Sequence, residues 1–164
     1  MIRVEVGALV DQEAEGVVRP IRSDLAPVTA ASRDLGQIAG EGVEERLARM
    51  APLPVGGAVL TPAGGLPAGF IIHVVVMSPE EPQTSLSIQK ALKNGLRRAV
   101  DWGLESLAVP PLGIGVGTLE PEDAARAFVE ILMNHVAEGE APLDLTIVVG
   151  SDYEASLFGR LLAG

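Results

Sequence analysis

Cysteine is absent from this 164-residue sequence, which excludes disulfides, thiolate metal sites and thiol nucleophiles together. Aromatic residues make up only 3% of the chain, with one Trp and one Tyr, so the stacking side chains typical of single-strand binders are scarce. Basic residues are also few: 12 Lys and Arg against 22 Asp and Glu give a formal net charge of −10. Because nucleic-acid backbones are bound by Lys and Arg that displace counterions, we expect a small-molecule ligand and no nucleic-acid partner.

Long hydrophobic runs are missing as well. No apolar stretch reaches the roughly 18 residues needed to cross a bilayer, and the alternating residues 1–6 lack the basic-then-apolar layout of a secretory signal. We therefore expect a cytoplasmic protein without a membrane partner. A hydrophobic content of 48% argues against disorder, and residues 1–164 suit a single domain. The oligomeric state stays open.

Hydrophobic patterning predicts strands that alternate with helices. Val- and Ile-rich segments bounded by Gly, Pro or charged residues predict strands, and apolar residues on one helical face predict helices. The predicted strands are residues 3–6, 16–19, 58–61, 69–76, 106–109 and 145–149, and the predicted helices are 35–50, 85–102, 121–136 and 153–162. Several strands are apolar on both faces, as strands covered by helices are. The sequence therefore predicts an α/β fold, a three-layer α/β/α sandwich.

Glycine stands at every second position of the loop that follows the strand predicted at 106–109. Without Cβ atoms, glycines let a ligand approach the main chain, and successive free N–H groups form a concave site for phosphate oxygens. In open α/β sheets, ligands gather outside the carboxyl ends of strands, where this loop would lie. We expect phosphate binding there, although many such loops only turn the chain. The residues are Gly113, Ile114, Gly115, Val116 and Gly117.

Two familiar nucleotide motifs do not fit this loop. A dinucleotide fingerprint needs a third glycine three positions after the second, where Thr118 stands. A P-loop ends in Lys-Ser/Thr, where Leu119 and Glu120 stand.

Several blocks of the chain resemble the macrodomain family, an ADP-ribose-binding α/β/α module. The resemblance rests on residues 56–67 with 70–73, on 107–117 with the helix start at 121–125, and on 2–7 and 152–155. It spans nearly the whole chain. It implies a mixed, mostly parallel six-stranded sheet between helices, an ADP-ribose-like or other anionic metabolite as ligand, and no cofactor.

The adenine side of the site departs from the family. Family members read Gly-Asp-Ile after the first strand, with the Asp accepting a hydrogen bond from the adenine amino group. Here Ala8 and Leu9 occupy the Asp and Ile positions. Near the end of the last strand, where an aromatic often stacks on adenine, stand Val149 and Gly150. The resemblance therefore implies a degenerate adenine site at Ala8 and Leu9.

The ribose side departs as well. Family members read Asn-Ala-Ala-Asn at the end of the second strand, and the last Asn contacts the distal ribose. This chain has Arg19 and Arg22 at the two Asn positions. The family's first glycine-rich loop is replaced by residues 27–33, which contain no glycine. The second phosphate loop alone is retained.

Three arginines surround the expected cleft, Arg19, Arg22 and Arg33. A guanidinium group binds phosphate and carboxylate in a bidentate manner. The arginines therefore either contact a different anionic ligand or pair with nearby carboxylates and plug the site. The expected carboxylate partners are Asp11, Glu15, Asp24 and Asp34.

No serine of the sequence has an identifiable His or Lys partner base, so nucleophilic catalysis has no support and we assign no catalytic residue. His73 follows an apolar run, which favours a packed, hydrogen-bonded role, and His135 near a helix end fits a solvated role. Neither has neighbours spaced for a metal site. We therefore expect a binding module. The alternatives are a hydrolase of ADP-ribosyl esters or ADP-ribose 1''-phosphate, and a ligand-free structural or oligomerisation domain.

Overall fold

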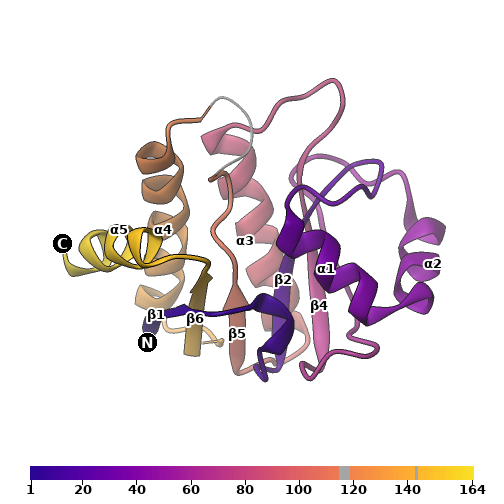
Figure 1. The fold of residues 1–164 in the computed structure, drawn as a ribbon, viewed down its shortest axis with the longest axis horizontal. Helices are drawn as coiled ribbons and strands as arrows, with labels where there is room; N and C mark the ends of the chain where they lie inside the picture. Colours follow the sequence, from indigo (N-terminus) through magenta and orange to yellow (C-terminus); the bar gives the residue numbers. More distant parts are fainter. Residues whose placement is uncertain (115–118, 143) are drawn as a thin grey trace.

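The computed structural model describes residues 1–114, 119–142 and 144–164. Its strands and helices alternate along the chain as the sequence predicts (Figure 1). The strands are β1 (Ile2–Val6), β2 (Gly16–Arg22), β3 (Ala58–Pro62), β4 (Phe70–Met77), β5 (Ser106–Val109) and β6 (Asp144–Val149). The helices are the 3-10 turn η1 (Leu9–Asp11), α1 (Ala30–Ala39), α2 (Glu41–Met50), α3 (Ser85–Asp101), α4 (Pro121–Ala137) and α5 (Asp152–Ala163).

The strands form one six-stranded sheet in the order β1-β6-β5-β2-β4-β3. Neighbouring strands pair in parallel except β3, which runs antiparallel to β4. The carboxyl ends of the five parallel strands therefore meet at one edge of the sheet. The mixed, mostly parallel sheet implied by the family resemblance is confirmed.

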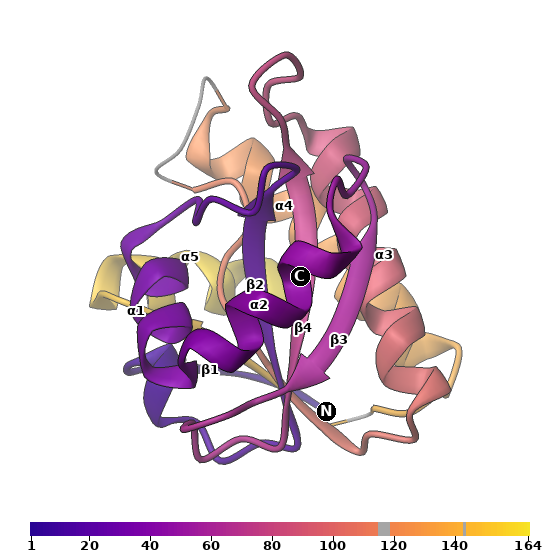
Figure 2. The ribbon, with the colours of Figure 1, turned by 90° about the vertical axis from the view of Figure 1, so that its right-hand side faces the viewer.

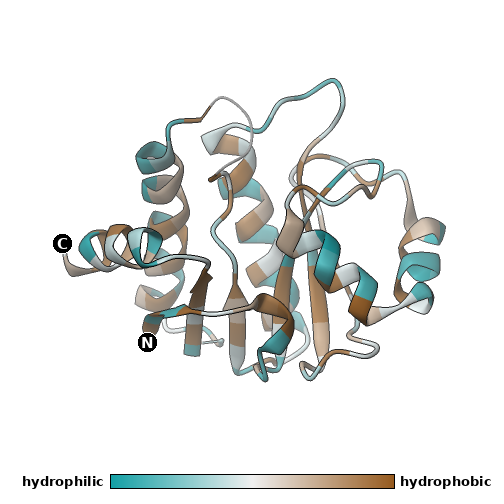
Figure 3. Cartoon of the chain, viewed as in Figure 1, coloured by the Kyte–Doolittle hydropathy of each residue, from teal (hydrophilic) through white to brown (hydrophobic). Residues whose placement is uncertain are grey.

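Helices cover both faces of the sheet (Figures 1 and 2). Leu35 of α1 belongs to the same buried cluster as Val17, whereas Phe128 of α4 belongs to that of Val18, because successive side chains of a strand point to opposite faces. The strands between these layers are largely hydrophobic (Figure 3). The three-layer sandwich is thus confirmed. Among the helices described, none is both long and apolar enough to span a membrane.

The helix predicted at 35–50 differs from the structure, which has two helices there. Gly40 has a φ of 100°, a left-handed conformation that glycine adopts without strain, and it separates α1 from α2. Helix α1 also begins earlier than predicted, because the side chain of Thr29 caps it by accepting a hydrogen bond from the Ser32 N–H at 3.1 Å.

Candidate ligand-binding cleft

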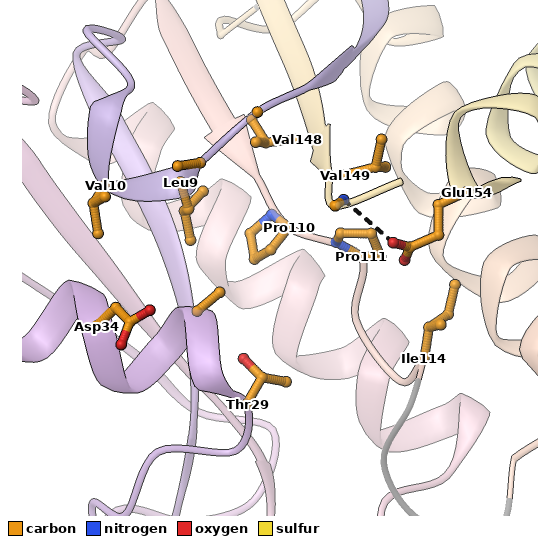
Figure 4. Close-up of a pocket in the computed structure, with 14 residues that line it drawn as sticks. Leu9, Val10, Thr29, Asp34, Pro110, Pro111, Ile114, Val148, Val149 and Glu154 are labelled. Carbon is orange, nitrogen blue, oxygen red and sulfur yellow. Dashed lines mark hydrogen bonds between the residues drawn. The ribbon is translucent and has the colours of Figure 1, made fainter. Parts of the chain in front are cut away.

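A cavity of about 370 Å³ opens at the carboxyl ends of β1, β5 and β6 (Figure 4). Ligands gather at this edge of open α/β sheets. The segments after β1, β5 and β6 and the starts of α1 and α5 form its walls. The described lining residues are Gly7, Ala8, Leu9, Val10, Thr29, Ala31, Asp34, Pro110, Pro111, Ile114, Val148, Val149, Gly150 and Glu154.

The walls of this cleft are mainly apolar. Leu9 of η1 is buried and packs against the sheet, and Val149 ends β6. Pro110 and Pro111 follow β5 and lie between these two segments in Figure 4. Apolar walls with a few placed polar groups are typical of small-molecule sites.

Two helices begin at the cleft, and their first turns differ in charge. Helix α1 has no acidic residue in its first turn, so its N-terminal dipole is free to attract an anion. Helix α5 carries Asp152 and Glu154 there. The Glu154 carboxylate accepts hydrogen bonds from the Gly150 N–H at 3.2 Å and the Ser151 hydroxyl at 3.4 Å, both through Oε1. The α1 side of the cleft therefore suits an anion better than the α5 side.

Asp34 and Glu154 are the charged residues among the described lining residues, and no Lys or Arg stands with them. The side chain of Asp34 is 56% exposed, and its Oδ1 lies 3.8 Å from Arg33 Nε. Both carboxylates are hydrogen-bond acceptors. The cleft thus offers an apolar slot, carboxylate acceptors and one favourable helix N-terminus.

The structure brings three of the predicted site residues into this cleft: Ala8, Leu9 and Ile114. Gly113 is not among the lining residues. Its φ is +90°, and a Cβ there would press against the side chains of Ile88 and Ala124, so this glycine serves the packing of the loop start. Gly115, Val116 and Gly117 lie outside the described residues.

Arg19 lies behind α1 and does not line the cleft. Its side chain is 3% exposed, its Nη1 forms an ion pair with Glu44 at 3.1 Å, and its Nε donates to the Ser32 carbonyl at 2.9 Å. Burial lowers the pKa of Arg19, and the charge of Glu44 opposes that shift. Arg19 thus holds α1 and α2 against the sheet, at a separate cavity of about 340 Å³ between these helices.

Arg22 and Arg33 also lie outside the cleft lining. Arg22 forms an ion pair with Asp24 at 2.9 Å, and Arg33 lies 3.8 Å from Asp34. Both aspartates were among the expected partners, whereas Glu44 was not. Since no arginine lines the cavity among the described residues, these ion pairs leave it open.

The histidines occupy the protein interior. The Nε2 of the fully buried His73 lies 2.9 Å from Thr61 Oγ1, and burial, together with the nearby Arg19 charge, lowers the pKa of His73 to about 3. The packed, hydrogen-bonded role expected for His73 agrees with this geometry. The solvated role expected for His135 is wrong: this side chain is 7% exposed, and its Nε2 lies 3.0 Å from the Pro142 carbonyl oxygen.

No sequence prediction assigned a ligand contact to Thr29, Asp34 or Glu154, which all line the cleft. A local signal existed for two of them. Ser151 and Glu154 have the Ser-x-x-Glu spacing of a helix start, and Thr29 stands at an N-cap three residues before Ser32. No local signal marked Asp34.

Comparisons with known proteins agree on one family. The Macro domain family model matches residues 24–128. An uncharacterized protein of Aeropyrum pernix is 40% identical over 129 residues, which cover 77% of this chain and 67% of that protein. The Oceanobacillus iheyensis macrodomain with ADP superposes with a TM-score of 0.86 at 21% identity, over 98% of this chain and 88% of that one. A mutant of the same macrodomain with ADPR gives 0.87 at 20% identity, over 98% and 90%.

Proposed function

This chain belongs to the macro domain family, and we propose that it binds ADP-ribose or a closely related nucleotide in the cleft lined by Ala8, Leu9 and Ile114. The observation that carries the proposal is the position and make-up of the cleft: an apolar slot at the carboxyl ends of parallel strands, beside the N-terminus of α1. Structural neighbours have been solved with ADP and with ADPR, which supports the same ligand class here.

The chemistry of the walls supports one orientation of the ligand. The pyrophosphate would lie at the start of α1, where free N–H groups and the helix dipole favour negative charge. The main chain of residues 114–117 would supply further donors to the same group. The base would occupy the apolar slot between Leu9 and Val149, near Ala8, the position where the family resemblance implies the adenine contact.

Glu154 offers a replacement for the carboxylate missing at Ala8. The hydrogen bonds described for its carboxylate use Oε1, so we propose that Oε2 accepts from the exocyclic amino group of adenine. A hydrogen bond to a charged group contributes about 1.5–3 kcal/mol, equivalent to roughly ten- to a hundred-fold in affinity. Glu154→Gln should reduce the preference for ADP over IDP, whose base carries a carbonyl in place of that amino group; calorimetric titration with both nucleotides measures it.

A matched pair of variants tests where the ligand binds. Ala31 lies on the exposed part of α1 and lines the cleft, whereas the exposed Ala48 of α2 does not. Ala31→Glu places a carboxylate where the pyrophosphate is expected, so it should reduce ADP-ribose affinity more than ten-fold. Ala48→Glu adds the same charge elsewhere and should leave affinity unchanged. Equal affinities of both variants and the natural chain would contradict the proposed site.

The glycine-rich loop has a separate test. If its main chain binds phosphate, Gly115→Val should lower the affinities for ADP and ADP-ribose alike. The affinity for adenosine should stay unchanged, because adenosine has no phosphate to contact the loop. Calorimetry with the three ligands gives the answer. Unchanged ADP affinity would restrict the phosphate site to the start of α1.

A further inference from the structure

A further cavity lies at the opposite edge of the sheet from the proposed ADP-ribose cleft. It measures about 490 Å³, and its residues come from the segment before β2, the start of β4 and the turn between α3 and β5. These are the amino ends of parallel strands, whereas the ADP-ribose cleft lies at the carboxyl ends. The lining residues are Glu13, Ala14, Glu15, Gly69, Phe70, Trp102, Gly103 and Leu104.

The aromatic wall of this cavity contains the only Trp of the chain. Trp102 caps the C-terminus of α3 and is 60% exposed. Its ring lies on that of Phe70, with centroids 5.7 Å apart and planes inclined by 48°. The face of an aromatic ring attracts a cation, and Trp does so most strongly.

The charged residues that line the cavity are both acidic. Glu13 and Glu15 are exposed, and no Lys or Arg is among the described residues that line it. The Glu15 carboxylate accepts a hydrogen bond from the Glu105 N–H at 2.7 Å through Oε2, which fixes its position. Aromatic faces and carboxylates in one cavity are complementary to a positively charged group.

Main-chain hydrogen bonds hold the walls in place. The carbonyl of Glu15 accepts from the N–H groups of Gly69 and Phe70 at 3.1 and 3.0 Å, which joins two walls. The N–H groups of Trp102 and Leu104 donate to the last turn of α3, at 3.1 and 3.0 Å. Little reorganisation would therefore accompany binding, which favours affinity.

We propose that this cavity binds an arginine side chain from a positively charged segment of a partner protein. A planar guanidinium stacks on an aromatic ring and pairs with a carboxylate at the same time, which an ammonium group does less well. The net charge of −10 also steers cationic partners towards the molecule. This site is separate from the proposed ADP-ribose cleft, because the two cavities share no residue.

Trp102 itself reports occupancy, since it supplies all the tryptophan fluorescence of the protein. The probe is a short Arg-Gly repeat peptide, and the control is the same peptide with each arginine replaced by citrulline, which keeps the shape and removes the charge. The arginine peptide should change the emission saturably, and saturating ADP-ribose should not displace it. Equal changes with the citrulline peptide, or with tetramethylammonium but not the arginine peptide, would overturn the proposal.

Variants measured by calorimetry locate the site. Loss of a cation–π contact or of one carboxylate should lower the affinity for the arginine peptide about three- to ten-fold. Trp102→Leu and Glu13→Gln should each have this effect. Glu45→Gln makes the same charge change on an exposed part of α2 and should leave the affinity unchanged. Both test positions are exposed, and unchanged thermal midpoints verify folding. If Glu13→Gln and Glu45→Gln weaken binding equally, only the overall charge acts and the site is wrong.

Discussion

At the scale of single residues, Gly36 and Arg19 show how tightly the layer behind the cleft is packed. Gly36 of α1 faces the buried guanidinium, and a Cβ there would lie 2.9 Å from Arg19 Cζ and closer still to Nη2. Glu44 and the Ser32 carbonyl hold the guanidinium in place, so it cannot move aside without losing these bonds. Local sequence could not reveal this arrangement, because Arg19 meets its partners only when α1 and α2 fold over β2.

Gly36→Ala should therefore destabilise the protein by about 1–3 kcal/mol, the usual cost of overpacking a core. Gly42→Ala is the matched control: its Cβ would meet no atom within 4 Å, so the better helix propensity should add up to about 1 kcal/mol. Urea denaturation of both variants measures the free energy of unfolding. Equal stabilities would show that Arg19 has room to move.

His73 should make stability depend on pH. The unfolded chain takes up this proton near the ordinary histidine pKa of 6.5, whereas the folded protein does so only at a pKa of about 3. Between these values the unfolded state binds more protons, so stability is highest above pH 6.5 and falls with decreasing pH by up to about 1.4 kcal/mol per pH unit. His73→Gln should flatten this slope in urea denaturation series. An unchanged slope would assign the pH dependence to carboxylates.

At the scale of elements, the strands were predictable because each is either an apolar run, as in β4 (Phe70–Met77), or an alternating segment, as in β1 (Ile2–Val6). The break between α1 and α2 was not, because Gly40 lies within one amphipathic pattern and only its backbone angle separates the helices. The cleft was predicted in part, by another route. Ala8 and Leu9 stand where the family resemblance implies the adenine contact, and both line the cleft. Asp34 enters the cleft from the second turn of α1, a position that no motif marks.

The cap of α1 should contribute to both stability and ligand affinity. Thr29 and Thr84 cap α1 and α3 through equivalent hydrogen bonds, from Ser32 N–H at 3.1 Å and Ser87 N–H at 3.0 Å. Each change to Ala should cost about 1 kcal/mol of stability. Of these two threonines, Thr29 lines the cleft and Thr84 does not. Thr29→Ala should therefore also lower the affinity for ADP-ribose about two- to ten-fold. If Thr84→Ala weakens binding equally, the effect comes from lost stability alone.

At the scale of the whole molecule, the two edges of the sheet present different chemistry under one strong negative charge. The proposed anion at the carboxyl edge would depend on main-chain groups and a helix dipole, since no Lys or Arg lines the cleft among the described residues. The cavity at the amino edge carries Trp102 with two glutamates. The net charge of −10 would oppose the binding of anionic ADP-ribose and favour that of the cationic arginine peptide.

Salt should therefore act on the two sites in opposite directions. The Debye length falls from about 30 Å at 0.01 M salt to about 8 Å at 0.15 M, so added salt screens the net charge. ADP-ribose affinity should rise across this range, because screening removes a repulsion, while that of the arginine peptide should fall. Calorimetry at both concentrations measures the two trends. A fall in ADP-ribose affinity would indicate that Lys or Arg side chains contact the phosphates after all.

The proposed ADP-ribose cleft is tested most directly by mapping the amide chemical-shift changes that ADP-ribose causes in the NMR spectrum of the protein. We expect saturable changes at Gly7, Ala8 and Leu9, at the start of α1 and around Glu154, with none near Trp102. Saturable changes confined to other surfaces, or none at millimolar ADP-ribose, would contradict the assignment of this cleft as the ligand site.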